Sequence, residues 1–199
     1  MQQPMNGYSV FAPDWLRHRA AGLPDVITDP DERMEVANEL AAESIAQGTG
    51  GPFGALIVDG VTGAVLGAGA NLVTSSNLAT AHAEVVTLSM AQFQAKAWNL
   101  SEIAQEPTLI VNAQPCAMCL GALIWSGIRH LEFAARGADV EAITGFDEGP
   151  VPEDWAQQLE RRGITVAQGR GETRAHEILS SFRRLVDNGS LPLYNGRAN

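Results

Sequence analysis

The sequence predicts an α/β fold, in which helices and strands alternate around a layered and partly parallel sheet. The first observation behind this prediction is a hairpin pattern over residues 50–71, where two apolar runs flank a turn between Gly60 and Gly63. The second is that short apolar runs typical of strands alternate with stretches of helical periodicity after this hairpin. The two hairpin strands are expected to be antiparallel, and the later strands partly parallel.

A helix is expected before the hairpin, over residues 29–48. Asp29 can cap its N-terminus, Pro30 suits its first position because no N–H donor is needed there, and Gly48 can end it. The elements expected after the hairpin are, in order, a helix over residues 81–97, a strand over 108–111, a helix over 115–126, a strand over 130–135, a helix near 154–162, a strand over 164–168 and a helix near 173–186.

The chain is expected to form one folded domain with a short N-terminal arm. Its 199 residues are enough for one substantial core. Residues 1–28 are rich in Pro and Gly with scattered aromatic side chains, and they are predicted to pack on the domain as an arm. Residues 29–199 are predicted to form the domain and its C-terminal tail, since no repeat, low-complexity run or linker interrupts them.

The charge balance argues against nucleic acid and membrane partners. The 23 acidic residues outnumber the 13 Lys and Arg residues, which gives a formal net charge of −10, and the basic residues form no run that would bind a phosphate backbone. No segment approaches the roughly 20 apolar residues that a membrane span needs, and the first residues do not resemble a signal peptide. The sequence therefore predicts a soluble, cytoplasmic protein, in which two cysteines are more often ligands or a redox pair than a disulfide.

The only two cysteines, Cys116 and Cys119, lie in a Pro-Cys-x-x-Cys motif at the start of a predicted helix. Their spacing brings both sulfur atoms to one side of that helix, and a helix N-terminus favours the thiolate form that binds a metal. Tetrahedral zinc needs a third protein ligand and, in a catalytic site, one open position for water.

His82 is the natural third ligand, because it lies at the start of the preceding helix, where Thr80 is a candidate cap. Helix starts that follow neighbouring strands meet at one edge of an open α/β sheet. Glu84 follows two residues later and is expected not to be a metal ligand. Its expected role is to take a proton from an activated water and to pass it to a leaving nitrogen.

Each motif alone is weak, since a lone Cys-x-x-Cys is as often a redox pair as a metal site and a lone His-x-Glu occurs by chance. Together and in this order they form the pattern typical of zinc deaminases. A structural zinc site would require four protein ligands, whereas this sequence supplies three and a carboxylate suited to catalysis. The other histidines have no such neighbours and are expected to be packing or surface residues: His18, His130 and His176.

With these motifs the chain resembles the cytidine-deaminase-like superfamily over roughly residues 30–199. The resemblance implies a three-layer αβα sandwich, with a five-stranded mixed sheet that begins with the antiparallel hairpin. It also implies one zinc ion per subunit, held by His82, Cys116 and Cys119, with Glu84 as the proton shuttle. One position departs from the pattern, because members often have Glu where this chain has Gln114; this changes the polarity beside the metal but removes no ligand.

The segments GGPFGA, GAGAN, GFDEGP and YNGR resemble the bacterial guanine deaminase branch of this superfamily. In that branch an Asn after the second strand and an acidic residue of the Gly-Phe-Asp-Asp/Glu motif hold the purine. The resemblance therefore implies these roles for Asn71 and Glu148, with Glu148 preferred over Asp147. A carboxylate and an amide together can pair with the N–H and the adjacent carbonyl of guanine. Further substrate contacts are expected from Phe53, Phe146, Ala81 and Tyr194.

The resemblance implies deamination of guanine to xanthine and ammonia by a homodimer, in which the C-terminal segment with Tyr194 crosses to cap the partner's site. From the residues alone, the two phenylalanines could equally be core residues and the acidic pair a solvated loop. The same chemistry on another ring also stays open, namely an aminotriazine such as ammeline, another aminopurine or a pterin. Deamination of tRNA adenosine uses the same motifs but requires a basic face, whereas the last helix and the tail are mixed in charge.

Overall fold

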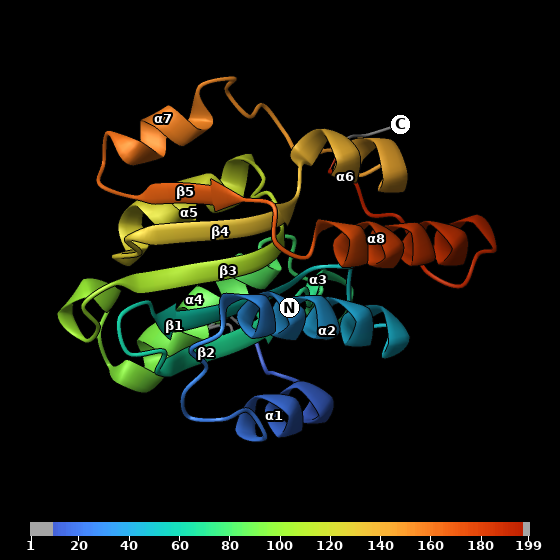
Figure 1. Cartoon of the computed structure of the whole chain (residues 1–199). Coiled ribbons are helices and arrows are strands. Elements are labelled where there is room, and N and C mark those ends of the chain that lie inside the picture. Colours follow the sequence, from blue (N-terminus) through green and yellow to red (C-terminus); the bar gives the residue numbers. More distant parts are fainter. Residues whose placement is uncertain (1–9, 197–199) are drawn as a thin grey trace, which may run out of the picture.

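Five strands form a single mixed sheet at the centre of the molecule (Figure 1). The structure is a computed structural model, and it describes residues 10–196. The strands are β1 (Gly54–Asp59), β2 (Val65–Ala70), β3 (Pro107–Ala113), β4 (His130–Ala135) and β5 (Thr165–Gln168), and their order across the sheet is β2-β1-β3-β4-β5.

The strand directions agree with the sequence pattern. β1 pairs antiparallel with both β2 and β3, whereas β3, β4 and β5 are parallel to one another. The predicted antiparallel hairpin and the partly parallel remainder of the sheet are therefore confirmed.

The turn of the hairpin is held by the Asp59 carboxylate. Its oxygens accept hydrogen bonds from the Val61 N–H and the Thr62 hydroxyl, both at 3.1 Å. A third bond, from the Glu106 N–H at 3.2 Å, ties the turn to the segment before β3. Gly63 ends the turn at a φ of 76°, which glycine adopts without steric cost.

Helices cover both faces of the sheet, which gives the predicted three-layer αβα sandwich (Figure 1). One outer layer is formed by α2 (Pro30–Ala46) and α8 (Glu172–Asp187), and the other by α4 (Ala83–Ala95) and α5 (Ala117–Ser126). The strands supply alternate side chains to the two cores, since Leu56 and Val58 join the α2 side while Ala55 and Ile57 join the α4 side. Because both faces are covered, β1 and β3 are buried along their whole length.

The other helical elements are α1 (Asp14–Ala21), α3 (Val73–Ser76), η1 (Leu100–Glu102), α6 (Gly137–Thr144) and α7 (Trp155–Glu160). Only α7 was among the predicted elements, whereas α1, α3, η1 and α6 were not. α1 lies in the region predicted as an arm, where it packs against β2 and buries Leu16 completely. Residues 1–9 of that region and residues 197–199 of the tail lie outside the described residues.

α2 begins as predicted. The Asp29 carboxylate accepts a 2.9 Å hydrogen bond from the Asp31 N–H, and Pro30 takes the first helical position. The helix ends at Ala46, two residues before Gly48, which has a φ of 64°. With 17 residues α2 is longer than the other helices among residues 10–196, none of which is long and apolar enough to cross a membrane.

The two helices that carry the candidate ligands begin differently from the prediction. The cap residue of α4 is His82 rather than Thr80, and that of α5 is Cys116, so Pro115 precedes the helix instead of taking its first position. The reason is that His82 and Cys116 have the extended backbone of a cap residue, with ψ of 155° and 172°. Neither side chain caps its own helix, and both point elsewhere.

Candidate active site

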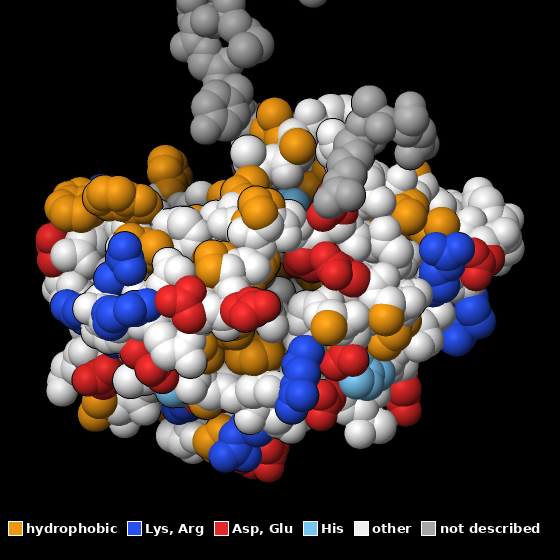
Figure 2. Space-filling view, turned by 90° about the horizontal axis from the view of Figure 1, so that it is seen from above, with side chains coloured by type: hydrophobic (Ala, Val, Ile, Leu, Met, Phe, Trp, Pro, Cys, Tyr) orange, Lys and Arg blue, Asp and Glu red, His pale blue; other side chains and the backbone are white. Residues whose placement is uncertain are grey.

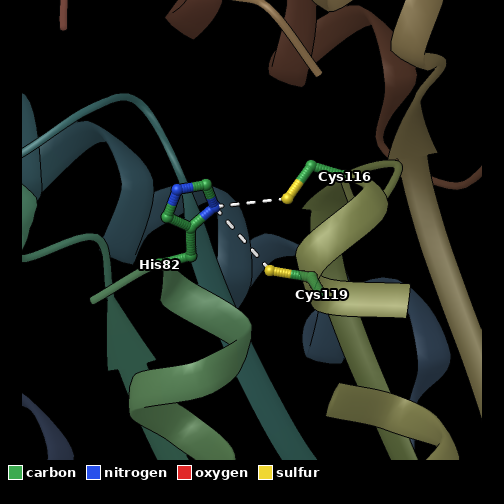
Figure 3. Close-up of side chains that lie close together, drawn as sticks. All are labelled: His82, Cys116 and Cys119. Atoms are coloured by element: carbon green, nitrogen blue, oxygen red, sulfur yellow. Dashed lines mark hydrogen bonds between the residues drawn. The ribbon is translucent and has the colours of Figure 1, made fainter. Parts of the chain in front are cut away.

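Three side chains from two helix starts converge on one point (Figure 3). The Nδ1 atom of His82 lies 3.5 Å from the Cys116 sulfur and 3.7 Å from the Cys119 sulfur. All three ligand atoms lie within 4.8 Å of one another. A tetrahedral zinc ion with ordinary bond lengths separates a nitrogen and a sulfur ligand by about 3.6 Å. The observed distances and the nitrogen–sulfur donor set therefore fit zinc, with one position left for water.

The sulfur atoms are prepared for a metal by their surroundings. The Cys119 thiol donates a hydrogen bond to the Cys116 sulfur. This bond and the contact with His82 outweigh the effect of burial and lower the pKa of Cys116 to about 4. The same bond and burial raise the pKa of Cys119 well above its usual range. Although burial opposes it, the Cys116 sulfur raises the pKa of His82. One thiolate is therefore present in the chain itself, and the second forms when a metal displaces its proton.

Glu84 lies beside this cluster without belonging to it. Its side chain is buried in the first turn of α4, with the residue only 5% exposed. Burial first, and then the charge of Cys116, raise the pKa of Glu84 to about 7. A carboxyl group with a pKa near neutrality can both accept and return a proton, as a general acid–base residue must.

A cavity of about 210 Å³ opens directly onto the cluster. Its wall contains His82, Cys116 and Glu84, and also four of the predicted substrate-contacting residues: Phe53, Phe146, Glu148 and Tyr194. Further wall residues that were not predicted as contacts are Ala79, Ala113, Gln114, Asp147, Asn195 and Gly196. Asn195 and Gly196 belong to the YNGR segment, whose resemblance to guanine deaminases could have indicated that they line the site. Nothing in the residue type of Ala79 indicates a place in the cavity wall.

Asn71 is fully buried next to this wall but does not line it. Its Oδ1 atom accepts hydrogen bonds from the N–H groups of Gly51 and Val73, each at 3.1 Å. Its Nδ2 atom makes no hydrogen bond of normal geometry within residues 10–196. The Asn71 amide lies close to the Tyr194 hydroxyl. Burial raises the pKa of Tyr194, and the contacts of its hydroxyl with Gly51 and Asn71 partly offset this rise.

Ala81 is not brought to the cavity. It is buried, and its carbonyl accepts a 2.9 Å hydrogen bond from the Leu72 N–H, which holds the chain before His82. Its side chain lines a separate groove on the outside of α4 that also contains Phe93.

Glu148 reaches the cavity from the loop after α6. Its carbonyl accepts a 3.0 Å hydrogen bond from the Ala117 N–H, and its own N–H donates to Glu141 Oε1 at 3.3 Å. Burial first, and then the negative charge of Cys116 and Glu84, raise the pKa of Glu148 to about 8. The carboxyl group is thus held close to the candidate ligands and can be neutral or charged near pH 7.

Aromatic rings form the apolar side of the cavity. The ring of Phe146 lies 5.5 Å from that of Phe53 and 4.8 Å from that of Tyr194, with tilts of 51° and 55°. Behind it, Phe182 of α8 stacks at 5.2 Å and fixes the position of Phe146. Phe146 is therefore both part of the core and part of the cavity wall.

Comparison with known proteins agrees with this geometry. Residues 28–135 match the family model of the cytidine and deoxycytidylate deaminase zinc-binding region. This range contains the three clustered residues and Glu84. The chain belongs to this deaminase family. The predicted zinc-dependent hydrolytic deaminase is thereby confirmed, and His82, Cys116 and Cys119 form the candidate zinc site of the deaminase domain.

Several deaminases are similar over most of the chain. The guanine deaminase of Bacillus subtilis is 38% identical over 135 residues, which cover 68% of this chain and 82% of that protein. The tRNA-specific adenosine deaminase of Buchnera aphidicola is 33% identical over 131 residues, which cover 66% of this chain and 79% of that protein.

Solved structures give a closer match. The guanine deaminase from Nitrosomonas europaea superposes with a TM-score of 0.85 at 38% identity, over 92% of this chain and 100% of that one. A mutant of the protein NE0047 in complex with 8-azaguanine superposes with a TM-score of 0.84 at 40% identity, over 89% of this chain and 97% of that one.

Proposed function

We propose that this deaminase converts guanine and water to xanthine and ammonia. The observation that carries the proposal is that one small cavity holds two partly or fully buried carboxyl groups, those of Glu84 and Glu148, directly beside the His–Cys–Cys cluster. The similarity to guanine deaminases over most of the chain supports the choice of guanine.

The two carboxyl groups have separate roles in this proposal. When bound, zinc supplies a Lewis acid that makes a water molecule acidic enough to be used at neutral pH. Glu84 would take a proton from the water as the water oxygen bonds to C2 of the purine, and it would deliver a proton to the amino group, which leaves C2 as ammonia. Its burial keeps bulk water away from the proton that it carries.

Glu148 and Asn71 hold the purine. Guanine presents ring N–H donors next to a carbonyl acceptor, so a carboxylate and an amide N–H can pair with it together. The Nδ2 of Asn71, which makes no hydrogen bond of normal geometry within residues 10–196 and lies beside Tyr194, supplies the amide donor. Phe53 and Phe146, whose rings lie 5.5 Å apart, together form an apolar wall against the purine ring.

Other amino-substituted rings are the nearest alternatives. NE0047 has also been solved in complex with 2,6-diaminopurine, which shows that a related cavity holds a second aminopurine. Aminotriazines such as ammeline and pterins present the same amino-substituted carbon, so they belong in any substrate test.

Two observations disfavour tRNA as the substrate despite the similar tRNA-specific relatives. On the face shown in Figure 2, Lys and Arg side chains are interspersed with Asp and Glu and form no continuous basic stripe. The small cavity is also lined by the C-terminal residues Tyr194 to Gly196, which narrow the space for a nucleotide within a polynucleotide.

The proposal includes a cytoplasmic homodimer that acts in purine metabolism. Phe93 of α4 and Trp125 of α5 are 87% and 79% exposed on the outer helical layer, and burying such large apolar side chains favours self-association. The tail lines the cavity, so in this dimer it caps an active site, either that of its own chain or, after exchange of the C-terminal segments, that of the partner. In this proposal residues 29–199 are the catalytic domain, and residues 1–28 are an N-terminal arm, of which the described part, residues 10–28, packs on the domain through α1.

Ammonia release from a panel of guanine, guanosine, cytosine, cytidine, adenine and ammeline tests the proposal, with Glu84→Ala as the blank. We expect turnover of guanine by the wild type and none by the variant. Turnover of another ring with inert guanine would contradict the recognition roles of Asn71 and Glu148. If none of these compounds reacts in the zinc-loaded protein, tRNA has to be tested next.

A further inference from the structure

The short helix α6 links two parts of the candidate active site. It begins at Gly137, directly after β4, and ends at Thr144, directly before the loop with Phe146 and Glu148. Its cap residue, Arg136, makes no side-chain hydrogen bond to it. The first N–H groups of a helix lack the usual partner one turn earlier, so a group from another part of the chain can stabilise the helix by accepting from them.

Gln114 provides that cap from the loop between β3 and α5. Its Oε1 atom accepts a 3.1 Å hydrogen bond from the Gly137 N–H. Glycine permits this approach, because a Cβ atom at position 137 would lie 3.1 Å from Gln114 Nε2. The bond also settles the orientation of the amide, since only the oxygen can accept it. Gln114 lies two residues before Cys116 and lines the cavity.

The other end of α6 holds the loop with Glu148. Thr144 accepts a 3.1 Å hydrogen bond from the Phe146 N–H through its hydroxyl oxygen. Glu141 accepts the 3.3 Å bond from the Glu148 N–H through its carboxylate. On its other side, the Glu148 carbonyl accepts the bond from Ala117, the residue after Cys116.

These contacts form a closed ring. It runs from Gln114 to the start of α6, along α6 to Glu141, from there to Glu148, and back through Ala117 to the loop of Gln114. We propose that Gln114 is a positioning residue for Glu148, because its amide oxygen anchors the helix that sets the distance between Glu148 and the candidate zinc site. The role rests on the proposed function, in which Glu148 holds the purine.

Two substitutions at position 114 separate the hydrogen bond from the bulk of the side chain. Gln114→Met keeps a long unbranched side chain but lacks the acceptor, whereas Gln114→Glu keeps an acceptor oxygen. We expect Gln114→Met to lower kcat/KM for guanine by about tenfold or more, since small displacements of a positioning group cost this much. We expect Gln114→Glu to retain more activity than Gln114→Met. Gln157→Met, at an exposed glutamine of α7, is the matched control and should match the wild type.

A double-mutant cycle with Glu148→Gln distinguishes positioning from general destabilisation. If Gln114 acts through Glu148, Gln114→Met has little further effect once the Glu148 carboxylate is gone. Where turnover falls below detection, the dissociation constant of 8-azaguanine measured by calorimetry completes the cycle. Zinc content and melting temperature, measured on each variant, should stay close to those of the wild type.

The positioning role would be overturned if Gln114→Met lowered kcat/KM, or weakened 8-azaguanine binding, by the same factor in the wild type and in Glu148→Gln. It would also be overturned if Gln114→Met left the activity of the wild type unchanged. A wild type that releases no ammonia from guanine would instead reject the proposed function, and the role of Gln114 in that reaction with it.

Discussion

The rings of Phe146 and Tyr194 lie 4.8 Å apart and join the loop after α6 to the C-terminal tail. The neighbouring Asn195 strengthens this junction, because its amide accepts from the Asp147 N–H at 3.1 Å and donates to the Gly145 carbonyl at 3.0 Å. The tail is thus an integral part of the cavity wall, and the aromatic pair forms part of its apolar side.

Tyr194→Ala should weaken substrate binding. Loss of the aromatic contact and of the cover over the cavity is expected to raise KM for guanine by about tenfold, with a smaller effect on kcat. Tyr194→Phe keeps the ring and removes only the buried hydroxyl, whose contacts with Gly51 and Asn71 lack normal hydrogen-bond geometry, so it should stay near the wild type. Steady-state kinetics measure both, and an unchanged KM in Tyr194→Ala would show that the tail does not close the site.

Glu84→Gln should abolish most of the activity without removing the metal. The amide has nearly the same shape as the carboxyl group but cannot carry the proton, so kcat should fall by about a hundredfold to ten-thousandfold. Because Glu84 is not part of the His–Cys–Cys cluster, zinc content measured by mass spectrometry should remain one ion per chain. Loss of zinc together with activity would mean that Glu84 serves the metal rather than the proton.

Removal of zinc should destabilise the protein as well as inactivate it. The ligands join the starts of α4 and α5, so metal that binds only the folded chain adds to its stability. A strong chelator is expected to lower the melting temperature by more than about 4 °C, and added zinc should restore it. In Cys119→Ser the chelator should have a much smaller effect. Equal shifts in both proteins would place the stabilising metal elsewhere.

The Asp59 carboxylate should make the free energy of unfolding depend on pH in the acidic range. Burial alone would raise its pKa, but the hydrogen bonds from Val61, Glu106 and Thr62 outweigh burial and leave the pKa below its usual value. The ionised group therefore stabilises the fold above the ordinary pKa of about 3.9, and this contribution is lost as the pH falls through the lower folded pKa. Asp59→Asn should cost about 1 kcal/mol near pH 7 and almost nothing near pH 2. Urea unfolding across this range measures it, and a cost independent of pH would contradict the assignment.

The elements that could be predicted from the sequence are those with local signals. Asp29 and Pro30 start α2 by contacts within one turn, and the hairpin turn between Gly60 and Gly63 depends on neighbouring residues. α6 could not be predicted in this way, because its cap is Gln114, which comes from a distant loop. The same holds for α1, whose burial of Leu16 depends on the sheet rather than on a strong pattern of its own.

The candidate zinc site was predictable because its chemistry resides in residue types and spacing. The cavity wall was predictable only in part. Asn195 reaches the wall through hydrogen bonds to the loop of Asp147, and no local pattern in the sequence reveals such a long-range contact. Ala81 was expected as a substrate contact, and in the structure it lines the separate groove rather than the cavity.

His82 and Cys116 occupy positions where most helices carry a serine, threonine, aspartate or asparagine. A change such as His82→Asp would give α4 the capping bond that it lacks, worth about 1 kcal/mol, and would destroy the candidate zinc site at the same time. Selection for stability alone therefore acts against the residues that the chemistry requires. The cap residues of these two helices make no side-chain capping bond, which is the energetic cost of using them as candidate zinc ligands, and stabilising redesign of this enzyme must leave both positions unchanged.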